Sequence, residues 1–218
     1  MALAIFDLDN TLIDREAAFR RWAETFVSAH NLPGEALPWL VEADGDGYTP
    51  RAQFLAAVAA RYGVDKPAGD FRAELVDAID LDPRVPALLD ALRRSGWKVA
   101  IATNGTTAQQ HAKLRRTGLI DHVDAVAVSE EVGAPKPDAR MYEAAANRCS
   151  MTLTESAWMI GDCPARDMSG ARSAGLRTIW LHRGRTWDRR SPSPDAEIAH
   201  ITEAFAILSA AEPGPAPR

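Results

Sequence analysis

Apolar and polar positions form two different patterns along this chain. Short, nearly continuous apolar runs indicate buried β-strands, and amphipathic stretches between them predict helices. We expect helices over residues 85–95, closed by Gly96, and over residues 106–117, closed by Gly118. The runs that predict strands cover residues 2–8, 98–103, 124–129, 157–161 and 177–181. Strands that alternate with helices predict an α/β fold with a doubly wound parallel sheet.

One long interval, residues 14–82, interrupts this alternation because it contains only helical signals. Asp14 is a good helix N-cap, and Phe19, Trp22 and Phe26 follow it on one face of the predicted helix. We therefore expect a helical module inserted after the first strand.

This insertion predicts a division of the chain into a core, an inserted domain and a tail. The prolines at positions 83 and 86 stiffen the return from the insertion. The tail is Pro-rich, so we expect it to be disordered. The predicted parts are an α/β core domain of residues 1–14 and 83–211, a helical domain of residues 15–82, and a disordered tail of residues 212–218.

Composition narrows the class of protein without identifying it. The chain has 218 residues, of which 46% are hydrophobic and 25% are charged, so it can bury a sizeable core. No apolar run approaches the roughly 20 residues that cross a bilayer, and Asp7 stands where a secretory signal would still be apolar. We expect a cytoplasmic protein with no membrane partner, either a monomer or a homodimer.

Charge and cysteine content exclude two further classes. The net charge of −5 argues against a general nucleic-acid surface, although a local basic pocket could still bind a small anion. The two cysteines, Cys149 and Cys163, are too few for a disulfide framework or a Cys-rich metal site. We expect both thiols to be reduced.

Acids follow two of the predicted strands at their carboxyl ends, where open α/β sheets bind ligands. The first strand ends in DLDNT, and side chains two residues apart in an extended segment point the same way, so Asp7 and Asp9 can share a site. The fourth strand runs into GDCPARD, which supplies Asp162 and Asp167. Folding alone does not call for these carboxylates, which indicates a functional site.

Hydrogen-bond donors follow the second and third predicted strands. The second ends in TNG, where Thr103 offers a hydroxyl and Asn104 and Gly105 offer exposed amides ahead of a helix N-terminus, a place that favours anions. The segment GAPKPD follows the third strand and fixes Lys136 between two prolines. A lone loop lysine is usually solvated, but this position favours a role in the same site.

Carboxylates that meet in one cleft repel one another, and some of their pKa values rise unless a cation lies among them. Oxygen ligands suit a hard divalent ion, and Mg²⁺ is the usual occupant. We expect Asp162 to hold the metal with Asp7. Asp167 either completes the shell through water or orients its neighbours; alternatively, it is only an acid favoured by a helix dipole near Pro164.

The segments DLDNT, TNG, KPD and GDCPARD occur in this order, and with them the chain resembles the haloacid dehalogenase superfamily of hydrolases. The resemblance covers nearly the whole chain. It implies a Rossmann-like core with a helical cap inserted between the first two motifs. Two departures are mild: Ala139 stands where a second proline is frequent, and Cys163 stands where serine is common.

The resemblance also implies a role for each motif residue. Asp7 would be the nucleophile, attacking phosphorus to give an aspartyl-phosphate. Asp9 would protonate the leaving oxygen and then activate water, and its backbone carbonyl would bind Mg²⁺. Thr103 and the Asn104 amide would hold the phosphoryl oxygens. Lys136 would neutralise these oxygens and Asp7.

The predicted function is a Mg²⁺-dependent phosphatase that acts on a small phosphorylated metabolite. A 2-haloacid dehalogenase would use an aspartate ester but would need no metal and no acid for the leaving halide, so Asp9 counts against it. A phosphomutase would use the same catalytic groups and differ in how its cap excludes water. A non-catalytic binding protein would be favoured by a lost nucleophile or metal ligand, and none is lost.

The predicted cap does not reveal the substrate. Its aromatic residues share one helical face and are expected to form a cap core, and its arginines, including Arg51, are expected to be solvated. The segment DGDGY, residues 44–48, is similar to a calcium loop but lacks the later glutamate ligand. We interpret it as a turn.

Overall fold

The computed structural model describes residues 2–64, 68–154 and 156–211, so the predicted disorder of residues 212–218 lies outside the described residues. The chain divides into two compact units, of which one is Asp14–Asp80 and the other consists of the segments on either side of it. Among the described residues, helices are too short or too polar to cross a bilayer.

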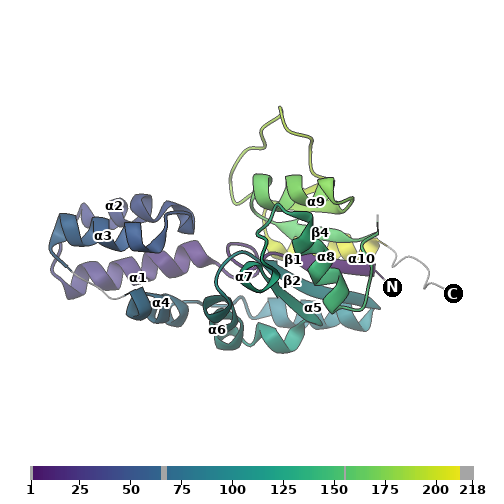
Figure 1. Cartoon of the computed structure of the whole chain (residues 1–218), viewed down its shortest axis with the longest axis horizontal. Helices are drawn as coiled ribbons and strands as arrows, with labels where there is room; N and C mark the ends of the chain where they lie inside the picture. Colours follow the sequence, from purple (N-terminus) through teal and green to yellow (C-terminus); the bar gives the residue numbers. More distant parts are fainter. Residues whose placement is uncertain (1, 65–67, 155, 212–218) are drawn as a thin grey trace. The chain divides into compact units, whose positions relative to one another are not determined.

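Six parallel strands form one sheet, in the order β3-β2-β1-β4-β5-β6 (Figure 1). This order confirms the predicted doubly wound α/β fold, because the direction of strand addition reverses between β1 and β4. The strand β6 was not predicted, since three residues are too few to show a periodicity. The strands are β1 (Ala2–Phe6), β2 (Trp97–Thr103), β3 (Ala125–Val128), β4 (Trp158–Gly161), β5 (Arg177–Leu181) and β6 (Ala196–Ile198).

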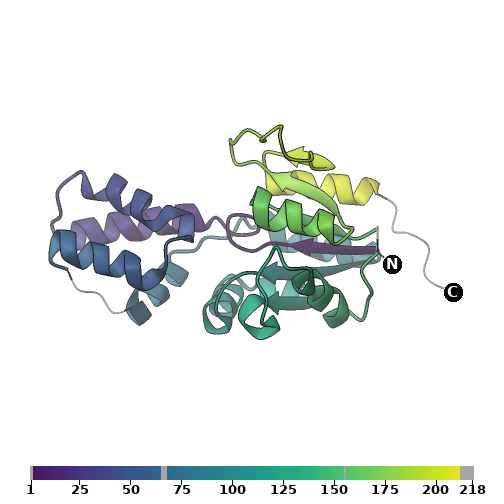
Figure 2. The same cartoon turned by 45° about the horizontal axis from the view of Figure 1, so that its top comes forward.

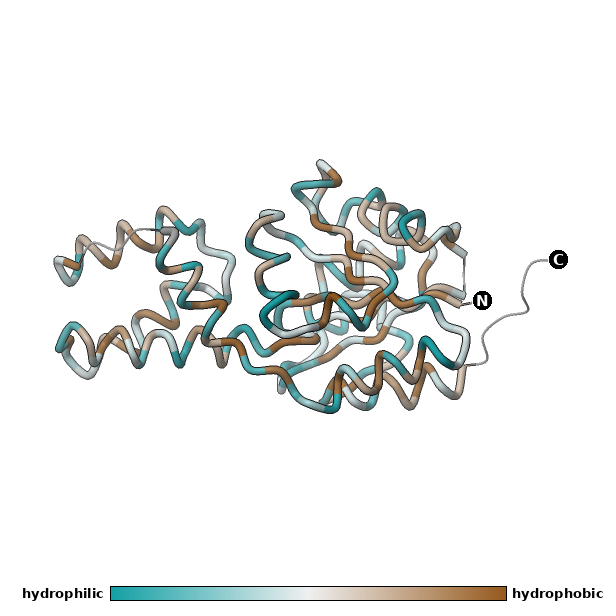
Figure 3. Tube along the Cα trace, turned by 90° about the horizontal axis from the view of Figure 1, so that it is seen from below, coloured by the Kyte–Doolittle hydropathy of each residue, from teal (hydrophilic) through white to brown (hydrophobic). Residues whose placement is uncertain are grey.

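Helices cover both faces of the sheet (Figure 2). Leu3 and Ile5 of β1 belong to a buried cluster with Met141 of α8, while Phe6 stacks on Phe205 of α10 with ring centroids 5.6 Å apart. Because successive strand side chains point to opposite faces and all five residues of β1 are apolar and buried, β1 is apolar on both. Figure 3 colours the chain by hydropathy and shows hydrophobic stretches in the interior of this unit. The helices and helical turns of this unit are α5 (Arg84–Arg94), α6 (Thr107–Thr117), η2 (Leu119–His122), α7 (Ser129–Val132), α8 (Ala139–Arg148), η3 (Pro164–Met168), α9 (Ser169–Ser173) and α10 (Ile201–Ala210).

The Asp14–Asp80 unit is helical throughout its described elements, and aromatic rings form its core. The ring of Trp22 lies 4.5 Å from that of Phe71, and Phe19 lies 5.7 Å from Phe54. These side chains are buried, so the aromatic face predicted from the sequence is core. The elements are α1 (Arg15–Ala29), α2 (Ala36–Asp44), η1 (Gly45–Gly47), α3 (Arg51–Tyr62) and α4 (Ala68–Asp77).

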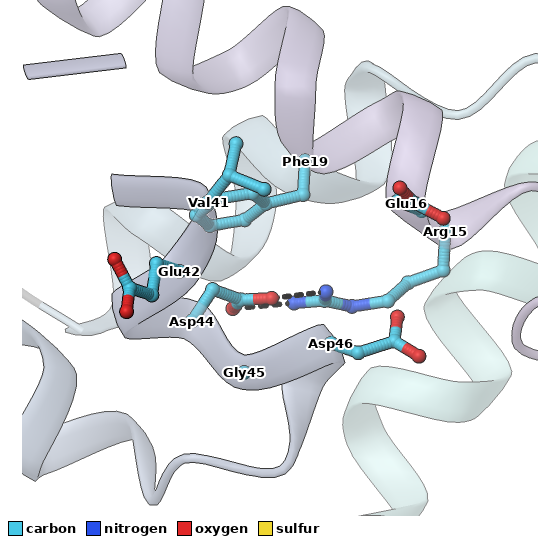
Figure 4. Close-up of a pocket in the computed structure, with 8 residues that line it drawn as sticks. All are labelled: Arg15, Glu16, Phe19, Val41, Glu42, Asp44, Gly45 and Asp46. Atoms are coloured by element: carbon cyan, nitrogen blue, oxygen red, sulfur yellow. Dashed lines mark hydrogen bonds and ion pairs between the residues drawn. The ribbon is translucent and has the colours of Figure 1, made fainter. Parts of the chain in front are cut away.

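A buried ion-pair cluster, made of Arg15, Asp44 and Arg51, lies inside this helical unit. Arg15 binds both carboxylate oxygens of Asp44, and Arg51 Nη1 lies 2.9 Å from Asp44 Oδ1. Arg15 and Asp44 line an open pocket of about 300 Å³ (Figure 4). The expectation that Arg51 is solvated is wrong, because this carboxylate holds it. The DGDGY segment is a turn, as predicted, with the Gly47 amide donating to Asp44 Oδ2 at 2.8 Å.

Candidate active site

The reversal of strand order brings the ends of β1 and β4 side by side. The Asp7 amide donates to the carbonyl of Ile160 at 2.8 Å, which continues the β1–β4 ladder one residue past β1. Asp162 follows β4 directly. The two acids therefore leave neighbouring strands at the same edge of the sheet, where doubly wound folds bind ligands.

Lys136 joins two of the predicted acids. Its Nζ lies 2.6 Å from Asp7 Oδ1 and 2.7 Å from Asp167 Oδ1. Asp7, Lys136 and Asp167 are all buried. One carboxylate oxygen from each of Asp7, Asp162 and Asp167 lies within 4.8 Å of the others. The structure thus gathers three acids and one lysine from three different segments.

The turn η3, a single π-type turn, turns Asp167 inward. Asp167 Oδ2 accepts a hydrogen bond from the Cys163 amide at 3.0 Å, while Oδ1 accepts from Lys136. A Cβ on Gly161 would lie 2.3 Å from Asp167 Oδ2, so only glycine at position 161 leaves room for this carboxylate. Asp167 is therefore part of the buried cluster, and a role limited to the helix dipole does not describe it.

Burial dominates the electrostatics of Asp7. It raises the pKa of Asp7 to about 8; Lys136 opposes the rise, and Asp167 and Asp162 add to it. Burial alone would lower the pKa of Lys136, but Asp167 and Asp7 together raise it above its ordinary value. The lysine therefore stays protonated, and one ammonium does not balance the surrounding carboxylates.

The donor set of this cluster fits a hard divalent cation. Three buried carboxylates supply oxygen ligands, and they outnumber the basic side chains that bind them, Lys136 and Arg185. A Mg²⁺ ion would offset the excess and favour the ionised form of Asp7. Asp7, Asp162 and Asp167 are the residues placed to hold it.

The predicted donors after β2 lie in three different environments. Thr103 is buried, and its Oγ1 accepts a hydrogen bond from Gln110 Nε2. The Asn104 side chain forms a reciprocal pair with the backbone of Lys136, with distances of 3.0 and 2.8 Å. Gly105 is exposed, and its amide donates to Ser129 Oγ at 3.0 Å.

The side chain of Asp9 does not join the acid cluster but turns to helix α6. Its carboxylate accepts from Lys113 Nζ at 2.7 and 2.6 Å and from Gln110 Nε2 at 3.1 Å. Neither Gln110 nor Lys113 was predicted from the sequence. The sequence offered one signal, since Gln110 lies four residues before the apolar Leu114 and so shares its helical face.

Arg185 is a further residue of the site that was not predicted from the sequence, and it contacts Asp162. Its Nη2 donates to Asp162 Oδ2 at 2.9 Å and to the Asp162 carbonyl at 2.6 Å. The indole of Trp180 donates to the same carbonyl at 2.9 Å. The loop after β5 therefore anchors Asp162 from a second side.

Comparison with known proteins identifies the family. Residues 1–175 match the haloacid dehalogenase-like hydrolases. The chain belongs to this family. The resemblance inferred from its motifs is confirmed, and as a member of the family the protein is a hydrolase.

Members of the family with different activities are similar to this chain. A phosphoserine phosphatase from Thermus thermophilus is 35% identical over 94% of this chain and 98% of its own length. A (S)-2-haloacid dehalogenase from Pseudomonas sp. is 33% identical over 64% of this chain and 61% of its own length. Among solved structures, the HAD-hydrolase YfnB from Bacillus subtilis, bound to magnesium, has a TM-score of 0.76 at 23% identity and covers 95% of this chain and 98% of its own. This likeness shows a shared fold.

Proposed function

We propose that this haloacid dehalogenase-like hydrolase is a Mg²⁺-dependent phosphatase that hydrolyses a small phosphorylated metabolite through an aspartyl-phosphate on Asp7. The observation that carries the proposal is the convergence of three buried carboxylates and Lys136 at the ends of β1 and β4. Phosphoryl transfer spreads negative charge over three oxygens, so its catalyst needs cations and donors around them. Lys136 and the Thr103 hydroxyl are such groups.

The acid cluster accounts for the first chemical step. Asp7, Asp162 and Asp167 would hold Mg²⁺, together with the carbonyl of Asp9, and the bound ion would neutralise charge on the phosphoryl oxygens. A carboxylate oxygen of Asp7 attacks phosphorus, a new P–O bond forms, and the bond to the leaving oxygen breaks. Lys136, held against Asp7 and Asp167, orients the nucleophile and favours its ionised form.

Asp9 accounts for the proton transfers. It gives a proton to the leaving oxygen and later takes one from the water that attacks the aspartyl-phosphate. Asp9 lies two residues after Asp7, and its side chain is outside the acid cluster, where the ammonium of Lys113 favours the ionised form that serves as the later base.

Dehalogenation is the second candidate, and the similarity to a (S)-2-haloacid dehalogenase favours testing it. A halide leaves without a proton, and the reaction needs no metal. Neither Asp9 nor a group of three buried carboxylates has a use in that reaction. These residues support the phosphatase over the dehalogenase. A phosphomutase would use the same groups and is separated by testing for phosphate release.

The substrate class and compartment are part of the same proposal. The similarity to a phosphoserine phosphatase over nearly the whole chain makes phosphoserine the first compound in a screen of phosphorylated metabolites. The two cysteines are unpaired, which supports a reducing compartment such as the cytoplasm.

The proposal is tested on the purified protein with p-nitrophenyl phosphate and with 2-chloropropionate. We expect release of phosphate, loss of that activity with a chelator, and recovery with added Mg²⁺. Halide release from 2-chloropropionate is expected to be absent. Full phosphatase activity in the presence of the chelator, or halide release, would contradict the proposal.

The Asp9→Asn variant separates the roles of the two acids. Turnover is expected to fall by roughly 10²–10⁴-fold, because the variant keeps the nucleophile but loses the proton donor and the later base. With an aryl phosphate, which needs little protonation, the aspartyl-phosphate should accumulate. Trapping with hydroxylamine and peptide mass spectrometry should place the label on Asp7; a label on Asp9 in the wild-type protein would reverse the assignment.

A further inference from the structure

Two buried polar residues of α6, Gln110 and Lys113, lie outside every motif that the sequence analysis singled out. Lys113 is 3% exposed and Gln110 is 1% exposed. Because they are three residues apart, they share one face of the helix, together with the apolar Leu114. A buried face of this kind usually carries apolar side chains.

Lys113 holds the carboxylate of Asp9 through both of its oxygens. The distances from Lys113 Nζ are 2.7 Å to Oδ1 and 2.6 Å to Oδ2, and Gln110 Nε2 adds a contact to Oδ2 at 3.1 Å. The Asp9 side chain is 26% exposed, whereas that of Lys113 is 4% exposed. The buried partners thus fix the orientation of an acid that itself stays partly exposed.

Gln110 links Asp9 to Thr103. Its amide nitrogen carries two hydrogens and accepts none, so it donates one to Asp9 Oδ2 and one to Thr103 Oγ1. The Thr103 hydroxyl is therefore an acceptor in this contact, and its own hydrogen remains for another group. A phosphoryl oxygen in front of Thr103 would be such an acceptor.

Fold stability alone does not explain this arrangement. Taking an ammonium and a carboxylate out of water costs free energy that their attraction seldom exceeds, and apolar residues of similar volume often serve as well in such places. The neighbouring buried residue of α6, Leu114, is apolar. The charge at position 113 is therefore better explained by what it holds.

We propose that Lys113 and Gln110 are positioning residues that hold the Asp9 carboxylate and the Thr103 hydroxyl in place for phosphoryl transfer. This inference rests on the proposed phosphatase function. When the bond from phosphorus to the leaving oxygen breaks, the Asp9 proton passes to that oxygen, and Lys113 keeps Asp9 within reach of it. Loss of Lys113 therefore hinders substrates with poor leaving groups more than activated ones.

The test compares kcat/KM for an alkyl phosphate and for p-nitrophenyl phosphate in wild type and Lys113→Met. This ratio reports the first step, in which the leaving group departs. We expect Lys113→Met to lower the value for the alkyl phosphate by about 10–100-fold and the value for the aryl phosphate by less than about threefold. Gln110→Met should also weaken the aryl reaction, because Thr103 loses its donor.

Lys98→Met is the matched control. Lys98 forms an ion pair with Asp124 at 3.1 Å, in the same unit but at the start of β2. Lys98→Met should change kcat/KM for neither phosphate. Thermal unfolding measures whether each variant is folded. If Lys113→Met does not fold, Lys113→Gln replaces it, since an amide keeps a polar group at this position but carries no charge.

Two readouts separate failure of this inference from failure of the proposed function. A wild-type protein that hydrolyses neither phosphate overturns the proposed function. An active wild type with equal losses on both substrates in Lys113→Met overturns the positioning role. A crystal structure of Lys113→Met gives a test without activity: an Asp9 carboxylate within about 0.5 Å of its wild-type position would contradict the inference.

Discussion

The two units of this protein both bury aspartates against basic side chains, but with opposite charge balance. In the helical unit, one acid, Asp44, faces two arginines, Arg15 and Arg51. In the α/β unit, three acids lie together, of which Lys136 binds Asp7 and Asp167 and Arg185 binds Asp162. In the first cluster the basic groups outnumber the acid, whereas in the second the acids outnumber the basic groups.

The pKa values express this difference. Burial alone would raise the pKa of Asp44, but Arg15 and Arg51 lower it below its ordinary value. Burial raises the pKa of Asp7 to about 8, and Lys136 does not cancel that rise. A buried carboxylate is therefore not by itself a sign of function; the balance of charge around it distinguishes a structural ion pair from a candidate cation site.

Asp7→Asn gives the largest expected effect on the α/β unit. Phosphatase activity should fall by at least about 10⁴-fold, because an amide is a poor nucleophile and a weak metal ligand. Stability of the metal-free protein should not fall, since the variant removes one of the crowded acids. Activity assays and thermal unfolding measure the two effects, with the exposed Asp121→Asn as control. An active Asp7→Asn would remove covalent catalysis at this residue.

Asp44→Asn should have the opposite outcome in the helical unit. It removes the carboxylate charge that the buried Arg15 binds, so the free energy of unfolding should fall by about 3–5 kcal/mol. Denaturant unfolding measures the loss, and Asp70→Asn, which changes an exposed acid of the same unit, should have little effect. Equal stability of both variants would show that the Asp44 cluster contributes nothing to the fold.

The smallest expected effect is the pH dependence of Mg²⁺ binding. At neutral pH the metal-free protein holds a proton on Asp7, whose pKa is about 8, and Mg²⁺ must displace it. Apparent affinity should therefore rise by up to about tenfold per pH unit toward pH 8 and level off above it. Calorimetric titration in buffers of different ionisation enthalpy measures the proton release.

The raised pKa of Asp7 also determines how the stability of the metal-free protein changes with pH. The native state binds a proton on Asp7 between its ordinary value of 3.8 and about 8, where the unfolded chain does not. Stability from this group is therefore present at low pH and declines as pH rises through that window, whereas the lowered pKa of Asp44 gives the opposite trend at acid pH. Metal affinity that falls with rising pH would contradict the electrostatic account of Asp7.

The architecture could be predicted from the sequence because burial leaves a local pattern of apolar residues. Strands buried on both faces are nearly continuous apolar runs, so β1 to β5 were predicted, whereas β6, with three residues, was not. The gathering of Asp7, Asp162 and Lys136 was also predictable, because the carboxyl ends of parallel strands lie at one edge of a sheet. Motif order was sufficient to indicate the family.

Side-chain partners between distant segments required the tertiary structure. Asp9 and Lys113 are 104 positions apart, and nothing in either segment specifies that they meet. Arg51 looked like a solvated arginine because its partner, Asp44, was part of what appeared to be a simple polar turn. The Asn104 side chain binds the backbone of Lys136, a use that its motif does not suggest.

By itself, the sequence determined the sheet, the inserted helical segment and the set of strand-end acids, because apolar periodicity and residue order along a strand are local properties. Only the tertiary structure decided which acids carry excess charge and which are neutralised. That decision depends on distance and burial: a carboxylate in water is hardly affected by its neighbours, whereas one enclosed with Lys136 or Arg15 changes its proton affinity with every charge nearby.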